Sequence, residues 1–192
     1  MSTTMRYAGI GSRETPANHL AEMRRWGREL AARGWVLRSG AADGADSAFE
    51  AGAIEGGGNT EIMLPWDGFN GHLTGIPVDR FAAYGRAIRM ASEFHPGWAR
   101  LGRGPRSLMA RNIFQVLGRD LRSPVDFVLC WGRRPVYAPD GRIVDVSGGT
   151  GLAVRLAASL NIPVCHLDYH LSMNALKKII ADAEEKNAAT TA

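Results

Sequence analysis

Residues 6–13 read Arg-Tyr-Ala-Gly-Ile-Gly-Ser-Arg, a strand-like run that leads directly into a glycine-bearing turn. Thr15 and Pro16 then form a typical helix start, and apolar residues follow at helical spacing from Ala17 to Arg33. A strand, a glycine turn and a helix in this order can bind phosphate, because glycine lets the backbone approach an anion and the helix N-terminus offers free N–H groups. The stretch therefore predicts an α/β fold with an anion site.

Two later loops repeat this arrangement. Residues 39–46 read Ser-Gly-Ala-Ala-Asp-Gly-Ala-Asp, and residues 147–151 read Ser-Gly-Gly-Thr-Gly. Open parallel sheets bind ligands at the carboxyl ends of their strands, where we expect all three loops to meet. Three such loops favour a nucleotide site. The candidate ligand-binding residues are Gly9, Gly11, Ser12, Arg13, Ser39, Gly40, Asp43, Gly44, Asp46, Arg111, Asn112, Ser147, Gly148, Gly149, Thr150 and Gly151.

Several of these residues also have a purely structural interpretation. A tight turn explains the first loop without a ligand, and Asp43 could cap a helix instead of holding a ribose hydroxyl or a base amine. Arg111 beside Asn112, on a mostly apolar helix, could form a structural salt bridge instead of a phosphate contact. The loop at 147–151 gives the strongest anion signal, because consecutive glycines and two hydroxyls stand at a helix mouth.

The rest of the chain alternates strands with helices. Strands are expected at 35–39, 60–65, 125–131 and 162–167, and helices at 45–54, 79–91, 106–117, 150–160 and 173–186. This alternation predicts a single doubly wound Rossmann-like domain over residues 1–186, with a mostly parallel sheet and helices on both faces. Residues 133–146 are expected to form an inserted hairpin with its turn at 138–141, and residues 187–192 a polar tail.

The composition is that of an ordinary globular α/β domain, with 45% hydrophobic and 22% charged residues among 192. No apolar run approaches the ~20 residues that cross a membrane, and no signal-peptide pattern is present, so a cytoplasmic location without membrane partners is expected. Cys130 and Cys165 lie in strand-like runs and are expected to be buried free thiols. The sequence has no CxxC or HExxH motif, so neither a metal site nor a cofactor is predicted.

The basic residues are almost all arginine. Lys177, Lys178 and Lys186 account for three of the 23 basic residues, which leaves 20 arginines in a chain of net charge +4. Arginine suits bidentate phosphate contacts, although GC-rich coding also produces an arginine-rich composition.

Known nucleotide motifs are incomplete here. Glu14 stands where the GxGxxG fingerprint has its third glycine, and neither a GxxxxGK[ST] loop nor a GxSxG nucleophile motif occurs. The four motifs together, at 11–13, 39–46, 111–112 and 148–151, nevertheless resemble the SLOG superfamily in their order and spacing. That superfamily includes DNA-processing protein A and the Lonely Guy phosphoribohydrolases.

The resemblance extends from about Arg6 to Leu167 and implies a Rossmann-like nucleotide-binding domain that forms a homodimer. Two departures matter. Larger DNA-processing members carry extra helical domains, which we do not expect within these 192 residues. The phosphoribohydrolase motif PGGxGTxxE ends in an acidic residue, whereas this chain has Val154 and Arg155 there. The catalytic carboxylate of those enzymes is therefore missing unless Glu50 or Glu93 replaces it.

Three functions follow from these observations. The preferred one is a sensor or sequestering protein for a nucleotide or an ADP-ribose-like molecule, with phosphates at 11–13 and 148–150, ribose at Asp46 and added charge from Arg111. The first alternative is an N-glycosidic-bond hydrolase that uses Glu50 or Glu93 as general acid or base, with Arg111 steadying the phosphate.

The second alternative is a single-stranded DNA-binding protein. Its positive charge would come from a stripe of arginines, and aromatic side chains would stack on the bases. The residues concerned are Arg100, Arg103, Arg106, Arg133 and Arg134, with Trp98 and Tyr137.

Overall fold

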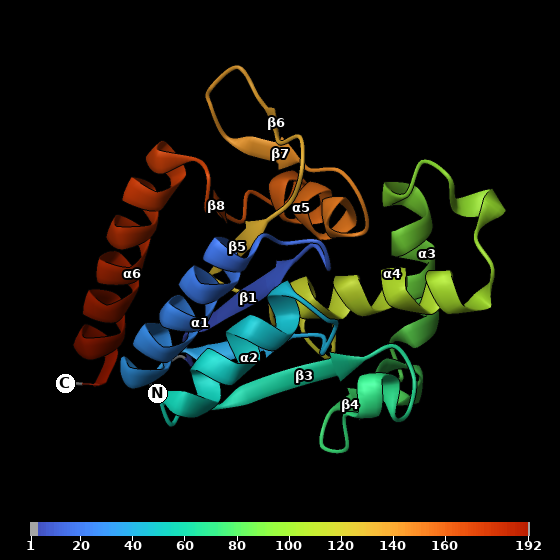
Figure 1. Ribbon diagram of the computed structural model, residues 1–192, viewed down its shortest axis with the longest axis horizontal. Coiled ribbons are helices and arrows are strands. Elements are labelled where there is room, and N and C mark those ends of the chain that lie inside the picture. Colours follow the sequence, from blue (N-terminus) through green and yellow to red (C-terminus); the bar gives the residue numbers. More distant parts are fainter. Residues whose placement is uncertain (1–3, 192) are drawn as a thin grey trace.

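A computed structural model describes residues 4–191 of the chain (Figure 1). Its centre is a six-stranded sheet in the order β4-β3-β2-β1-β5-β8, in which every neighbouring pair is parallel. The strands are β1 (Arg6–Gly11), β2 (Val36–Ser39), β3 (Thr60–Leu64), β4 (Ile76–Pro77), β5 (Phe127–Trp131) and β8 (Val164–His166). The strand order reverses direction beside β1, which is where such sheets place their ligand site. The predicted α/β class is confirmed.

Helices cover both faces of the sheet (Figure 1). The first face carries α1 (Ala17–Ala32), α2 (Ala45–Glu55) and α6 (His170–Thr191), and the second carries α3 (Tyr84–Phe94), α4 (Arg103–Leu117) and α5 (Thr150–Ser159). Successive strand residues point to opposite faces. Tyr7 and Phe127 accordingly join the core under α1 and α2, whereas Ala8 and Val128 join the core under α4 and α5.

A short antiparallel hairpin separates β5 from α5. Its strands β6 (Val136–Tyr137) and β7 (Ile143–Asp145) project beyond the end of the sheet, at the top of Figure 1. The Gly141 N–H donates to the Ala138 carbonyl at 2.9 Å, and Gly141 has a φ of +83°, a left-handed conformation that favours glycine. The turn therefore lies where the sequence places it.

The helix expected at 79–91 begins later than its apolar pattern indicates. Val78–Arg80 form a 3₁₀ turn and Phe81 is extended and buried, so α3 starts only at Tyr84. The loop expected after it is also shorter, because α3 reaches Phe94 and α4 starts at Arg103. This connection contains the 3₁₀ turn Trp98–Arg100. Pro105, the third residue of α4, is compatible with this start, because the first turn of a helix needs no internal N–H donor.

Two other predicted boundaries are wrong. Thr15 does not cap α1, because its hydroxyl donates to the Ser12 carbonyl at 2.7 Å and Pro16 occupies the cap position. The last helix runs from His170 to Thr191 instead of ending at Lys186, since no glycine or proline follows to stop it. None of the helices within residues 4–191 combines the length and the hydropathy needed to span a membrane.

Candidate functional site

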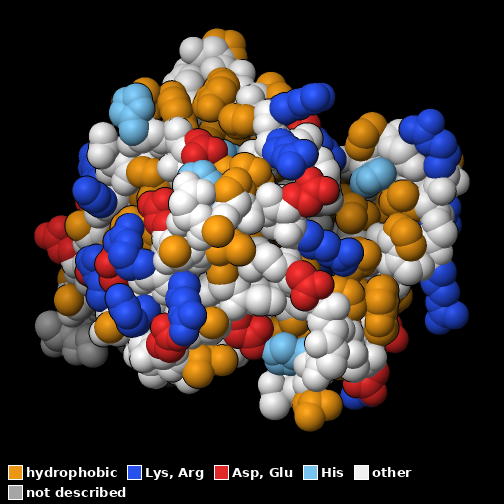
Figure 2. Space-filling model, in the orientation of Figure 1, with side chains coloured by type: hydrophobic (Ala, Val, Ile, Leu, Met, Phe, Trp, Pro, Cys, Tyr) orange, Lys and Arg blue, Asp and Glu red, His pale blue; other side chains and the backbone are white. Residues whose placement is uncertain are grey.

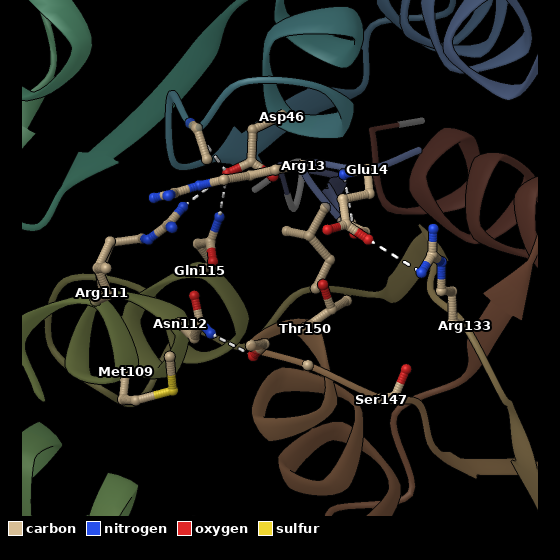
Figure 3. Close-up of a pocket in the computed structure, with 17 residues that line it drawn as sticks. Arg13, Glu14, Asp46, Met109, Arg111, Asn112, Gln115, Arg133, Ser147 and Thr150 are labelled. Carbon is tan, nitrogen blue, oxygen red and sulfur yellow. Dashed lines mark hydrogen bonds and ion pairs between the residues drawn. The ribbon is translucent and has the colours of Figure 1, made fainter. Parts of the chain in front are cut away.

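A pocket of about 460 Å³ opens at the carboxyl end of β1 (Figure 3). It lies between α4 and the three loops that the sequence singles out, as the parallel topology predicts. Its volume is in the range of small-molecule sites. The lining residues are Ile10, Gly11, Ser12, Arg13, Glu14, Ala42, Asp46, Leu108, Met109, Arg111, Asn112, Gln115, Arg133, Ser147, Gly148, Gly149 and Thr150.

One side of the pocket is the N-terminus of α5. Gly148 has a φ of +82°, which bends the chain into the helix, and Gly148 and Gly149 are exposed. Within residues 4–191 the N–H groups of Gly148, Gly149 and Thr150 donate to no other group. The helix dipole adds positive potential at this end. The loop therefore offers three backbone donors to an anion.

Asn112 holds this loop in place from α4. Its Nδ2 donates to the Gly149 carbonyl at 2.9 Å (Figure 3). That bond holds the Gly149 carbonyl toward α4. The N–H groups of the same turn stay without a partner within residues 4–191. Asn112 thus shapes the anion-binding turn in addition to lining the pocket.

The β1–α1 loop supplies an unpaired cation. Arg13 is exposed and forms no ion pair within residues 4–191. The loop itself is rigid, because the Ser12 N–H donates to the Trp131 carbonyl at 3.1 Å and the Ser12 hydroxyl accepts the Glu14 N–H at 3.0 Å. A guanidinium on a fixed loop is suited to a phosphate.

Asp46 and Arg111 form a buried ion pair between α2 and α4. Arg111 Nη1 lies 2.7 Å from Asp46 Oδ2, and the two side chains are only 7% and 3% exposed. Their charges offset each other, so this geometry favours the structural interpretation of Arg111 over that of a free phosphate ligand. Asp46 Oδ1 forms no hydrogen bond to any residue of the described chain and remains able to accept one.

Gly40 makes room for this ion pair. A Cβ atom at position 40 would lie 1.4 Å from Arg111 Nη1, so only glycine lets the guanidinium reach Asp46. Gln115 completes the cluster: with its amide oxygen toward Arg111 Nη1 and the Gly40 N–H, and its nitrogen toward Asn112 Oδ1, all three contacts measure 3.0 Å. No sequence motif includes Gln115, although a polar residue one helical turn after Arg111 on an apolar helix was an available signal.

The mouth of the pocket carries a second ion pair, which no sequence motif indicates. Arg133 Nη1 lies 3.2 Å from Glu14 Oε2, and both side chains are largely exposed (Figure 3). Leu108 and Met109 of α4 supply apolar surface to the lining. The pocket therefore combines backbone donors, two exposed arginines and an apolar wall.

Six candidate ligand-binding residues do not line this pocket. Gly9 packs against the Phe49 side chain, and the buried Ser39 hydroxyl donates to the Gly9 carbonyl at 2.7 Å. Asp43 is exposed and does not cap α2, because Gly44 occupies that position without a side-chain hydrogen bond. The six are Gly9, Ser39, Gly40, Asp43, Gly44 and Gly151, of which Gly40 acts through Arg111.

The two carboxylates considered for hydrolysis also lie outside the pocket. Glu50 Oε1 is 2.6 Å from His72 Nε2, and Glu93 is exposed on α3. Neither belongs to the lining, whereas Glu14 and Asp46 do.

The expected arginine stripe is divided among separate elements. Arg106 lies over the Trp98 ring at 5.3 Å in the α3–α4 region, and Tyr137 packs on Tyr169 beside the hairpin. Of the five arginines, Arg133 alone lines the pocket. On the face shown in Figure 2, basic side chains are interspersed with acidic ones instead of forming one band.

Burial shifts the pKa of three groups on β5 and β8. Desolvation lowers the pKa of His166, which is fully buried in β8 and donates from Nε2 to the Gly132 carbonyl at 2.8 Å. Burial also raises the pKa of the free thiols Cys130 and Cys165. Within residues 4–191, His, Cys, Asp and Glu side chains form no group of three that could hold a metal ion.

Comparison with family models and with curated proteins gives no match. The solved structures with a similar fold include those of a DNA processing protein and a Moco carrier protein. DNA processing protein A from Helicobacter pylori, described for its single-stranded DNA binding mode, superposes with a TM-score of 0.52 at 19% identity, over 92% of this chain and 73% of the other. The Moco carrier protein of Chlamydomonas rheinhardtii gives 0.51 at 18% identity, over 98% and 96%.

The fold similarity to DNA processing protein A, which the four motifs predict, is therefore confirmed. At these identities the similarity concerns the fold. The site must be interpreted from its own residues.

Proposed function

We propose that the protein binds a phosphate-bearing small molecule derived from a nucleotide, in the pocket at the carboxyl end of β1, and acts as a sensor or sequestering protein. The observation that carries this proposal is the set of three unused N–H groups at Gly148, Gly149 and Thr150. They share one pocket with the unpaired guanidinium of Arg13. Donors at a helix N-terminus together with an arginine form a favourable environment for phosphate.

The other pocket residues suit the remaining parts of such a ligand. Asp46 Oδ1 can accept a ribose hydroxyl while Oδ2 stays paired with Arg111. Leu108 and Met109 offer an apolar surface for a base. Arg133, held by Glu14 at the mouth, can turn toward a second phosphate. These assignments favour a mononucleotide or an ADP-ribose-like molecule.

Isothermal titration calorimetry with AMP, ADP, ADP-ribose and cyclic ADP-ribose tests the proposal. Arg13→Ala should weaken binding roughly tenfold or more, because a hydrogen bond to a charged group contributes about 1.5–3 kcal/mol. Arg28→Ala is the matched control, since Arg28 is also exposed and lies outside the pocket. If the folded protein gives no heat signal with any of the four compounds, the proposal is wrong.

Single-stranded DNA is a second candidate ligand, favoured by the fold similarity to a protein with that activity. Arg13 and Arg133 would then contact successive phosphates. Binding would weaken steeply as salt rises, because each neutralised phosphate releases counterions. An affinity for an oligothymidine that is flat with salt, or absent, would eliminate this candidate.

A further inference from the structure

A second groove, of about 1160 Å³, lies at the opposite end of the sheet and shares no residue with the pocket. Arg6 and Thr60, the first residues of β1 and β3, contribute to its lining. The segment before α3 and the loop after α4 close its other side through Phe81 and Arg122. The proposed nucleotide site does not involve this surface.

The groove concentrates positive charge. Six arginines line it, against the two carboxylates Glu61 and Asp120, and Asp67 at its border pairs with Arg80 at 2.8 Å, so a local excess of +3 remains. The arginines are Arg6, Arg38, Arg80, Arg86, Arg119 and Arg122. Glu61 is already neutralised, because Arg6 Nε lies 2.9 Å from its Oε1 and Arg38 Nη2 lies 2.7 Å from its Oε2.

Three of these arginines have no acidic partner. Arg86, Arg119 and Arg122 are exposed and form no ion pair within residues 4–191. The Arg119 guanidinium lies 5.0 Å from the centre of the Phe81 ring, an arrangement that holds the cation without neutralising it. The groove therefore presents unpaired guanidinium groups to an anionic partner.

The same groove contains an open sheet edge. β4 pairs with β3 only at Met63 and Leu64, so the first half of β3 has no neighbouring strand on that side within the described residues. The Leu37 N–H donates to the Asn59 carbonyl on the β2 side, and alternate residues of a strand face opposite neighbours. Thr60 consequently directs its backbone N–H and carbonyl to the open edge.

We propose that this groove docks an extended acidic peptide segment of a partner protein, which adds a strand beside the first half of β3. Main-chain hydrogen bonds to Thr60 would supply register, and carboxylates on the peptide would pair with Arg86, Arg119 and Arg122. Ile76, which is 41% exposed, gives apolar surface for the alternate side chains. A peptide can match both the donor and the acceptor of the edge, whereas phosphodiester oxygens only accept hydrogen bonds. This difference favours a peptide over a nucleic acid.

Fluorescence anisotropy with a labelled peptide of about ten residues, alternating Glu with Val and Thr, tests the proposal at about 50 mM salt. A peptide of equal charge with proline at alternate positions is the first control, because proline removes the N–H donors. Arg122→Glu should weaken binding of the alternating peptide about tenfold or more. Arg28→Glu changes the net charge equally but lies outside the groove, and should leave the affinity within about twofold.

Hydrogen exchange supplies the readout specific to strand addition. The bound peptide should slow exchange at the Thr60 amide, and the proline peptide should not. Absence of binding, equal binding of both peptides, or unchanged exchange at Thr60 would overturn the proposal. Preferential binding of an oligothymidine that is lost in Arg122→Glu would overturn it in favour of a nucleic acid. These outcomes do not depend on whether the pocket at the carboxyl end of β1 binds nucleotides in calorimetry.

Discussion

Replacing Gly40 with alanine should damage the protein through Arg111, although position 40 does not line the pocket. The new Cβ would stand 1.4 Å from Arg111 Nη1, so the guanidinium must leave its place. Asp46, only 3% exposed, would then lose its cation. Breaking a buried ion pair costs about 3–5 kcal/mol. The displaced guanidinium can regain water, so we expect a loss of about 3 kcal/mol in the free energy of unfolding.

Urea denaturation followed by circular dichroism measures this loss. In thermal denaturation followed by the same signal, the melting temperature should fall by roughly 6–12 °C, since 1 kcal/mol corresponds to about 2–4 °C for a domain of this size. Gly85→Ala is the control, because its Cβ would meet only Arg89 Nη1 at 3.9 Å, and an alanine in a helix is slightly stabilising.

A double-mutant cycle isolates the mechanism. In an Asp46→Asn/Arg111→Met background neither buried charge remains, although the new Cβ still meets the Gln115 amide at 2.7 Å, so Gly40→Ala should cost at least about 1 kcal/mol less than in the native background. An equal cost in both backgrounds, or no cost in the native background, would show that Gly40 does not act through Arg111.

Four further outcomes are expected. The free energy of unfolding should fall as pH drops below about 6.5, because burial lowers the pKa of His166 and the unfolded chain therefore binds a proton that the folded chain does not. Denaturant titrations at several pH values measure this slope. His166→Gln should flatten it by up to about 1.4 kcal/mol per pH unit. Asn112→Ala should cost about 1 kcal/mol in urea unfolding and weaken nucleotide binding several-fold in calorimetry, because the bond to the Gly149 carbonyl is lost. Glu50→Gln and Glu93→Gln should leave nucleotide affinity unchanged in the same titrations, and a decrease would revive the hydrolase alternative. Light scattering should give the mass of a homodimer, and a monomeric mass would exclude that expectation.

The fold was largely predictable because its signals are local. The apolar run at 125–131 and the helical spacing at 17–33 identify buried strands and amphipathic helices without tertiary information. The start of α3 was not predictable, because Val78 and Phe81 fit a helical pattern in the sequence. In the structure Val78 lies in a 3₁₀ turn and Phe81 in an extended segment, and both are buried. There, packing against α4 overrides the local preference.

The site was predictable only in part, for a related reason. Glycine loops mark an anion site by their composition, and the three loops do meet. The pairing of Asp46 with Arg111 joins residues 65 positions apart, and no local pattern reveals that their charges neutralise each other. Gly40 resembled a ligand-binding glycine, yet its lack of a side chain makes room for the Arg111 guanidinium. In the sequence, Glu14 stands out only in place of the third glycine of a GxGxxG fingerprint. Its contact with Arg133 and its place in the lining show that it borders the pocket.

Amide chemical shifts during a nucleotide titration show directly whether the pocket at the carboxyl end of β1 binds the ligand. With isotope-labelled protein and increasing AMP or ADP-ribose, the largest shifts should fall on the amides of Arg13, Gly148, Gly149 and Thr150, whose N–H groups donate to no group within residues 4–191. Shifts confined to the arginine groove around Arg86 and Arg122, or none at saturating nucleotide, would contradict this proposal.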